Sequence, residues 1–315
     1  MYKNDIKCFY LSKKEKKYAF YYNESPMFYI KNGISMHRII LKENMMMKKY
    51  IMTGLVLLAT MTLSACSGNA TQEDTSLKDV QEKGKLIVAL NPEFPPFEFR
   101  TLVDGKDTIV GADIELAKAI GQELGVEVEF SAMSFDNVLN NVQSGQSDIA
   151  ISGISATEER AKVYDFSIPY YTSTNKVIIN KEDLAQYKSL DSLAEANIGA
   201  QKGSIQEQII KEQLPSSTVI ALASNGELIN QLKSQKVEAV IFEEPIAKAY
   251  VAKNDDLVIL DTEIKSSYSD AYAIALPKGS TALKEKVDSV ITKLVESGQM
   301  DQFVQEAYEL SIANN

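Results

Sequence analysis

Short strand-like runs alternate with helical patterns along most of the chain. The strand-like runs are Leu86–Leu90, Val126–Phe130, Asp148–Ile151, Val177–Asn180, Asn197–Ala200, Thr218–Ala221, Glu238–Phe242, Leu257–Leu260 and Ala271–Leu276. Between or after them, the spacing of apolar residues predicts helices over 112–124, 135–143, 204–213, 225–235, 244–253, 281–296 and 299–309. Alternation of this kind predicts an α/β fold with largely parallel sheets, because parallel strands need crossover connections.

The rarest residue types exclude several kinds of catalytic site. The only His is His37, the only Cys residues are Cys8 and Cys66, and no His, Cys or Trp follows Ser67. Ser-His-Asp and Cys-His catalysis, zinc sites with His or Cys ligands, and disulfides therefore cannot be built from residues 67–315. We expect no cofactor, no metal site and no catalytic residue.

Charge is unevenly distributed along the chain. The formal net charge is −10, but residues 66–315 alone carry 22 basic and 39 acidic residues, a net −17. Phosphate binding needs clustered Lys and Arg, so we expect no nucleic-acid partner. The same argument opposes docking on anionic lipid through a basic surface.

The segment 47–65 has the order of a secretory signal peptide. Lys48 and Lys49 precede an apolar run at 51–63, and Ser64-Ala65 lead into Cys66. The run is too short to span a bilayer. Because Leu63-Ser64-Ala65-Cys66 resembles a bacterial lipobox, we expect lipid attachment at Cys66; an incidental Cys is the alternative. The polar residues 66–76 are predicted to form a flexible tether.

Residues 1–46 do not fit a signal peptide, which normally begins at its basic end. We expect them to result from a mis-assigned translation start, the true start being Met45, Met46 or Met47; a real N-terminal extension is the alternative.

Four strand ends carry polar or aromatic segments, and ligands of parallel sheets bind at such ends. The segments are Asn91–Phe99, Ser152–Arg160, Gln201–Ser204 and Glu243–Pro245. Together they offer aromatic rings, an Arg, a Gly-Ser turn into a helix, and a carboxylate. This set can hold an anion, an ammonium group and an apolar chain at once, which describes an α-amino acid.

Several segments resemble the polar amino-acid substrate-binding proteins of ABC importers, solute-binding protein family 3. The resembling blocks are Phe94–Phe99, Gly111–Ile120, Ser144–Asp148, Thr157–Arg160 and Phe166–Tyr170. The resemblance runs from Lys85 to Leu310. It implies a two-lobe periplasmic-binding-protein-like fold of type II, in which each lobe is a mostly parallel sheet flanked by helices and two hinge strands join the lobes. Lobe 1 is then 77–171 plus 271–315, and lobe 2 is 172–270.

The resemblance also implies roles for polar site residues. Arg160 would bind the ligand carboxylate through its planar fork, with help from Ser155. Gly153 would offer its carbonyl to the ammonium group. Glu243 stands where the family usually has an Asp that holds the ammonium, and Glu244 is the alternative. The ordinary alternative for Arg160 is a solvated surface residue.

The remaining implied positions surround the ligand side chain or close the site. Phe94 and Phe135 would flank the side chain, unless both are core residues. Asn91 occupies a position that is often acidic in relatives that bind cationic side chains, so its neutral amide weakens a simple choice of Lys or Arg as ligand. Gly203 and Ser204 would meet the carboxylate from lobe 2, and Lys202 is expected at the surface.

We therefore expect a monomeric, lipid-anchored receptor on the outer face of the cell membrane, which binds a polar L-amino acid and delivers it to an ABC importer permease. An enzyme on the same scaffold, such as a prephenate or arogenate dehydratase, is one alternative. A sensor or adhesin module is another, although we expect a sensor to continue into a transmembrane helix and a kinase.

Overall fold

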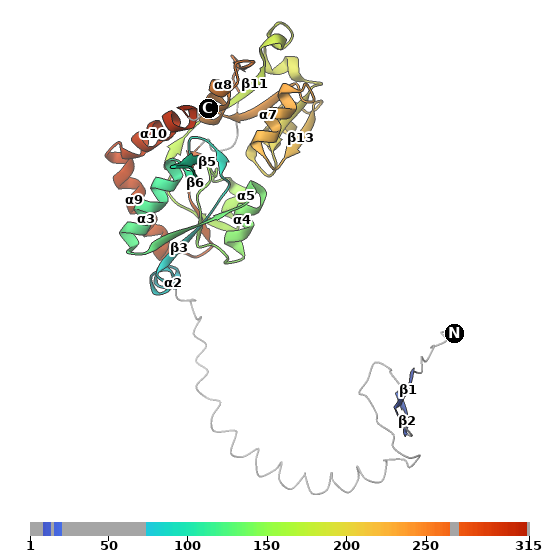
Figure 1. Ribbon diagram of the computed structural model, residues 1–315, viewed down its shortest axis with the longest axis vertical. Coiled ribbons are helices and arrows are strands. Elements are labelled where there is room, and N and C mark those ends of the chain that lie inside the picture. The colour runs from blue at the N-terminus through green and yellow to red at the C-terminus, as the bar shows by residue number, and fades with distance from the viewer. Residues whose placement is uncertain (1–8, 14–15, 21–73, 265–270, 314–315) are drawn as a thin grey trace. The chain divides into compact units, whose positions relative to one another are not determined.

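The computed structural model describes residues 9–13, 16–20, 74–264 and 271–313, in two units that divide after Thr71. In the first unit, β1 (Phe9–Lys13) and β2 (Lys16–Phe20) pair antiparallel (Figure 1). The predicted start at 45–47, the signal peptide and Cys66 lie outside the described residues.

The second unit contains two five-stranded sheets (Figure 1). In spatial order, the first sheet consists of β7 (Glu127–Ala132), β3 (Lys85–Leu90), β8 (Ile149–Ala150), β17 (Ala275–Pro277) and β9 (Tyr164–Phe166). The second sheet consists, again in spatial order, of β13 (Thr218–Leu222), β12 (Asn197–Gln201), β14 (Ala239–Glu243), β11 (Asn175–Asn180) and β15 (Leu257–Leu260). We call the parts built on these sheets lobe 1 and lobe 2.

Two smaller groups of strands complete the described β structure. β10 (Tyr171–Thr172) pairs antiparallel with β16 (Ala271–Tyr272), where the chain leaves lobe 1 and returns to it. β4 (Glu93–Phe94), β5 (Glu98–Val103) and β6 (Lys106–Val110) form an antiparallel sheet beside the first strand end of lobe 1. The predicted lobe boundaries, at 171–172 and 270–271, coincide with the β10–β16 pair. The exact limits of the lobes remain predictions.

Both large sheets are mixed, which refines the prediction of mostly parallel sheets. The pairings β7–β3–β8 and β13–β12–β14 are parallel, whereas β17 and β11 pair antiparallel with their described neighbours. β11 follows β10, and β17 follows β16, so each enters its sheet from the neighbouring lobe rather than through a crossover helix. The α/β class and the two-lobe fold are confirmed.

The described helices are α2 (Ser76–Lys83), α3 (Ala112–Leu124), α4 (Phe135–Gln143), α5 (Glu158–Ala161), α6 (Ile205–Gln213), α7 (Asn225–Lys233), α8 (Glu244–Lys253), α9 (Thr281–Glu296) and α10 (Gln299–Ala313), with 3₁₀ turns η1 (Lys181–Ala185) and η2 (Leu190–Leu193). α3 shows why the sequence predicts them: Leu116, Ile120 and Leu124 are buried on one face. Gly125 ends this helix with a φ of 70°, a left-handed conformation that costs glycine little.

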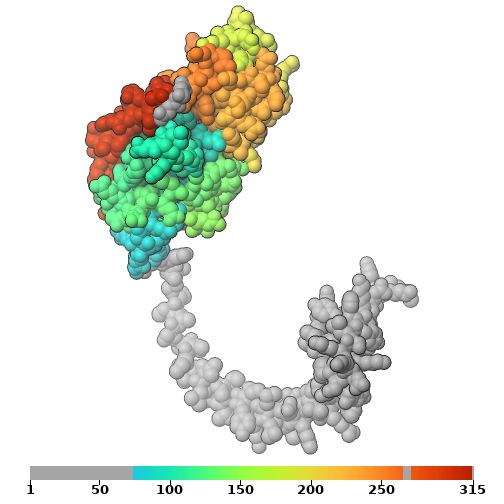
Figure 2. All heavy atoms as spheres, viewed as in Figure 1, coloured from blue at the N-terminus to red at the C-terminus, as the bar shows by residue number. Residues whose placement is uncertain are grey.

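The C-terminal helices belong to lobe 1. α9 and α10 both contact α3, and Figure 2 shows these red residues packed beside the green ones. At the hinge, the Tyr272 ring lies 5.0 Å from the Phe97 ring, and this edge contact joins the returning strand to lobe 1.

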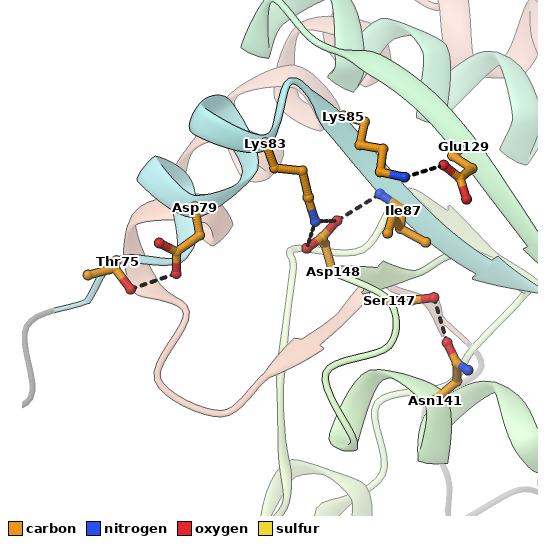
Figure 3. A network of polar contacts seen from close by, with 9 residues as sticks. All are labelled: Thr75, Asp79, Lys83, Lys85, Ile87, Glu129, Asn141, Ser147 and Asp148. Carbon is orange, nitrogen blue, oxygen red and sulfur yellow. Dashed lines mark hydrogen bonds and ion pairs between the residues drawn. The ribbon is translucent and has the colours of Figure 1, made fainter.

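The base of lobe 1 is tied together by polar contacts around Asp148 (Figure 3). The Lys83 Nζ lies 2.5 Å from Asp148 Oδ1, which fixes the end of α2, and the Ile87 N–H donates to Asp148 Oδ2 at 2.7 Å. The Lys85–Glu129 ion pair of 2.7 Å bridges β3 and β7. Within the described ranges, no helix has the length and apolar composition that a membrane crossing requires.

Candidate functional site

A small cavity lies where strand ends of the two lobes meet. Its volume is about 10 Å³, roughly the space of one water molecule. Lobe 1 contributes Phe94, Phe135, Gly153, Ser155 and Arg160, and lobe 2 contributes Gln201, Ser204, Ile205, Gln206 and Glu243.

Seven of the nine residues predicted for ligand binding line this cavity, and the other two touch its lining. Asn91 is buried, and its Oδ1 accepts a hydrogen bond of 2.9 Å from Gln201 Nε2 of lobe 2. Gly203 is exposed, and its carbonyl accepts from Arg160 Nη2 at 3.1 Å. The structure therefore brings the predicted set together, while the role of each residue stays a prediction.

Arg160 is held by its own loop and reaches into both lobes. It lies on the short helix α5, whose first turn is capped by Thr157 Oγ1, which accepts from the Arg160 N–H at 3.2 Å. Its Nη1 donates to the Ser155 carbonyl at 2.8 Å, while Nη2 reaches Gly203. The guanidinium carbon lies 5.9 Å from the centre of the Phe135 ring, which favours a cation there.

Opposite charges face each other across the cavity. Burial lowers the pKa of the Arg160 guanidinium, and the Glu243 carboxylate opposes that effect. Glu243 is 8% exposed, lies at the end of β14, and precedes the first turn of α8. A cavity with one cation on lobe 1 and one anion on lobe 2 matches the two charged ends of an α-amino acid.

Glu243 and Glu244 face different surroundings. Glu244 accepts from Thr174 Oγ1 at 2.9 Å and forms an ion pair of 2.7 Å with Lys248, and both contacts hold the pKa of Glu244 below its usual value. It lines a separate cavity of about 550 Å³ between β10, α8 and α10. Glu243 is therefore the one of the two that lines the space between the lobes.

Phe94 acts both as a core residue and as a cavity wall. Its ring lies 5.9 Å from Phe97 and 6.0 Å from Tyr272, and it is only 8% exposed. It also covers Gly153: a Cβ added at Gly153 would lie 2.3 Å from Phe94 Cε1. The ring and the glycine therefore fit together only because position 153 has no side chain.

The first turn of α6 forms the lobe 2 wall. Ser204 caps this helix, with its Oγ accepting from the Glu207 N–H at 3.4 Å. Ile205 and Gln206 follow at the cavity, and Gln206 Nε2 donates to Asn175 Oδ1 at 2.7 Å. Gln201, Ile205 and Gln206 were not predicted as site residues. Their place at the end of a strand and in the first turn of the next helix is the signal that could have identified them.

Further polar contacts join the lobes around the cavity. Lys202, expected at the surface, has a side chain that is 59% exposed, yet it pairs with Asp136 of lobe 1 at 2.8 Å. Glu93 of lobe 1 accepts from the Asn225 N–H at 2.8 Å through Oε2. With Asn91–Gln201 and Arg160–Gly203, these contacts make the described arrangement a closed one.

Comparisons with known proteins identify the family to which the chain belongs. Residues 86–309 match the family described as bacterial extracellular solute-binding proteins, family 3. The arginine-binding extracellular protein ArtP of Bacillus subtilis is 33% identical over 261 residues, which cover 81% of this chain and 96% of ArtP. The L-cystine-binding protein TcyJ of Escherichia coli is 26% identical over 77% of this chain and 90% of its own length.

A solved structure extends the likeness to three dimensions. The amino acid ABC transporter substrate-binding protein AbpA of Streptococcus pneumoniae, bound to L-arginine, is 56% identical and aligns with a TM-score of 0.73 over 75% of this chain and 99% of its own. These similar proteins are described as binding proteins, which favours a receptor over the dehydratase alternative. The chain belongs to the bacterial extracellular solute-binding proteins of family 3.

Proposed function

We propose that the chain holds an L-amino acid, L-arginine in the first instance, between its lobes and delivers it to an ABC importer permease. The observation that carries this proposal is the convergence of Arg160 and Glu243, with two aromatic rings, on one cavity between the lobes. The choice of L-arginine is supported by the ligand of AbpA and the name of ArtP.

In this proposal the charged ends of the ligand take the charged residues of the cavity. The carboxylate binds the Arg160 guanidinium in place of the Gly203 carbonyl, because an ionised acceptor forms the stronger hydrogen bond. The ammonium group binds Glu243 and the Gly153 carbonyl. The ligand side chain lies between Phe94 and Phe135, whose faces stabilise a guanidinium.

Binding then requires the lobes to separate and close again. A cavity of about 10 Å³ admits no amino acid, so access depends on motion at the β10–β16 pair. A ligand that contacts both lobes favours the closed state, because only that state offers all of its contacts. Asn91 contributes to closure through Gln201, and we assign it no counter-charge role.

We also propose that the protein acts on the outer face of the cell membrane as a monomer anchored through lipid on Cys66. This part is supported by the order of residues 47–66 and by membership of an extracellular family. The acidic body is suited to tethering rather than to direct attachment to anionic lipid.

A ligand screen tests the proposal. The melting temperature of the purified chain is measured with L-arginine, L-lysine, L-histidine, L-glutamine and L-cystine, and positive results are followed by calorimetry. A ligand at 100 times its dissociation constant stabilises the folded state by ~2.7 kcal/mol. A shift with L-arginine is expected. A shift with another of these amino acids but not with L-arginine refutes the choice of arginine, and no shift with any of them refutes the proposed receptor.

Two neighbouring carboxylates provide a matched test of the ammonium contact. Glu243→Gln removes one charge-assisted hydrogen bond, so we expect affinity to fall by roughly 10- to 150-fold, the equivalent of ~1.5–3 kcal/mol. Glu244→Gln is the control and is expected to bind as the wild type does, because Glu244 is paired with Lys248 in the other cavity. Calorimetry showing the reverse order would assign the ammonium contact to Glu244.

A further inference from the structure

Two buried carboxyl groups contact the segment Ser152-Gly153, whose Gly153 lines the cavity, and the proposed function does not use them. Glu98 is the first residue of β5 and is 0% exposed, and Asp113 is the second residue of α3 and is 1% exposed. Each carboxyl is close enough to the other to shift the other's pKa. Neither has a basic partner among the groups that perturb it, so their placement needs a different explanation.

One oxygen of each carboxyl is bound to Ser152 or Gly153; we call these two residues and Asn91, which Ser152 contacts, the cavity floor. Ser152 Oγ donates to Glu98 Oε1 at 2.5 Å, and it accepts from the Asn91 N–H at 3.0 Å. The Gly153 N–H reaches Asp113 Oδ2 at 3.4 Å, and Tyr170 donates to the same oxygen at 2.9 Å. The pair therefore holds the backbone at both Asn91 and Gly153.

The other oxygen of each carboxyl has no donor. Within residues 74–264 and 271–313, Glu98 Oε2 and Asp113 Oδ1 are buried without a hydrogen-bond partner. A single proton between the two carboxyls satisfies both atoms, since a protonated carboxyl donates and an ionised one accepts. A buried polar atom without a hydrogen bond destabilises the folded state, and one shared proton removes this destabilisation at both atoms.

The number of protons follows from the partners. With no proton, two carboxylates face each other in a buried space and repel. With two protons, the second proton needs an acceptor of its own. The Ser152 hydroxyl does not provide one to Glu98, because it already donates its hydrogen to that carboxyl. The one-proton form is the one in which every bond of this network has one donor and one acceptor.

We propose that Glu98 and Asp113 share one proton and that this singly protonated pair positions the backbone of Asn91, Ser152 and Gly153 at the cavity floor. The proton resides on Glu98, because Asp113 accepts two donors and lies in the first turn of α3, where a carboxylate is favoured. Both are positioning residues, whichever ligand the cavity takes.

The electrostatics of the pair agree with this assignment above about pH 7. Burial, and then the charge of Asp113, raise the pKa of Glu98 well above its usual range. Burial raises the pKa of Asp113 to about 7, against the stabilising bonds from Tyr170 and Gly153. The titratable groups that face the pair from other elements are Tyr170 and Tyr272 near the hinge and Glu243 at the end of β14.

The shared proton makes the free energy of unfolding depend on pH over a range in which few other groups titrate. The unfolded chain releases this proton near the ordinary pKa of Glu, so from just above the Asp113 pKa of about 7 up to the raised pKa of Glu98 the folded chain holds one proton more. Alkali then destabilises the fold, and the unfolding equilibrium constant rises about tenfold per pH unit. No His or Cys follows Ser67, and burial keeps the pKa of Tyr170 and Tyr272 well above 10.

Urea unfolding at several pH values in that window tests the proton without any ligand. We expect the tenfold slope in the wild-type chain 67–315 and a flat profile in Glu98→Gln, whose amide imitates the protonated acid. Glu244→Gln, in the other cavity, is the control and should retain the slope. A flat wild-type profile overturns the proposal, and so does a slope that Glu244→Gln removes and Glu98→Gln retains.

Amide hydrogen exchange tests the positioning role. The N–H groups of Asn91 and Gly153 should be equally protected in wild type and Glu98→Gln, and at least tenfold less protected in Glu98→Leu, which cannot accept from Ser152. The Ile87 N–H, bound to Asp148 in the same lobe (Figure 3), is the internal control and should not change. If Glu98→Leu does not fold, the test uses Glu98→Gln by itself. Lower protection of the Asn91 and Gly153 N–H groups in that variant than in the wild type overturns the proposal. These measurements do not depend on whether L-arginine binds.

Discussion

At the scale of single residues, the shape of the cavity depends on one missing side chain. Gly153 has a φ of 53°, and a Cβ there would lie 2.3 Å from Phe94 Cε1. Phe94 cannot easily retreat, because its ring packs against Phe97 and Tyr272. Backbone conformation and side-chain packing therefore both require glycine at this position.

The variant Gly153→Ala should lose both stability and ligand affinity. Left-handed backbone and overpacking together predict a loss of about 2–5 kcal/mol in the free energy of unfolding. Gly145→Ala is a matched control, since Gly145 has a φ of 71° but nothing within 4 Å of an added Cβ. It should cost only ~1–2 kcal/mol and leave affinity unchanged. Equal effects of the two substitutions, by urea unfolding and calorimetry, would show that the contact with Phe94 is unimportant.

At the scale of elements, the first turn of α6 brings lobe 2 to the cavity. Ser204 caps this helix just as Ser224 caps α7, where its Oγ accepts from the Glu227 N–H at 3.2 Å. Ser204 lines the cavity and Ser224 does not. The two caps therefore separate the role of a helix end in stability from its role in binding.

Ser204→Ala and Ser224→Ala should destabilise the protein similarly and affect binding differently. Loss of an N-cap typically costs ~1 kcal/mol of stability, and we expect this from each substitution. Ligand affinity should fall only in Ser204→Ala, because only that cap orients amide groups toward the cavity. Thermal unfolding and calorimetry on both variants provide the comparison, and equal affinities would remove α6 from the ligand contacts.

The sequence predicts the longer elements well and the short ones poorly. The apolar spacing over 112–124 and 135–143 matches α3 and α4 as the structure has them. The helix α2, the four-residue α5 and the β5–β6 pairing were not predicted. A four-residue helix is too short to show a period, and α5 depends on the Thr157 cap instead.

At the scale of the whole molecule, two bodies meet around one site and the chain crosses between them twice. The crossing strands explain why each large sheet is mixed, since β11 and β17 both arrive from the other lobe. Contacts such as Lys202–Asp136 are made between lobes rather than within one. An exposed pair of this kind is worth ~0.2–1 kcal/mol, so closure can remain reversible.

Cellular location also belongs to this scale, and Cys66 is predicted to determine it. Cys66→Ser should move the protein from washed membranes into the culture medium, because the acidic body 67–315 has no basic patch predicted to hold it on lipid. Cys8→Ser should remain with the membranes, since Cys8 precedes the predicted cleavage site. Immunoblots of both fractions provide the measurement, and membrane retention of Cys66→Ser would contradict lipid anchoring.

The sequence by itself determined the α/β class, the limits of α3, α4 and α9, and most of the segments that line the cavity between the lobes. Periodicity and strand ends carry this information, because they record which side of an element is apolar and where a chain can turn. Only the tertiary structure separates Glu243 from Glu244, which follow one another in sequence but line different cavities.

Tertiary packing also created the pairings that no local pattern contains. Asn91 and Gln201 meet although they are 110 positions apart in the chain. Glu98 and Asp113 each look like an ordinary charged residue in sequence, and burial against each other changes what they can do. Their shared proton depends on desolvation and on the donors around them, and both arise only when the elements pack together.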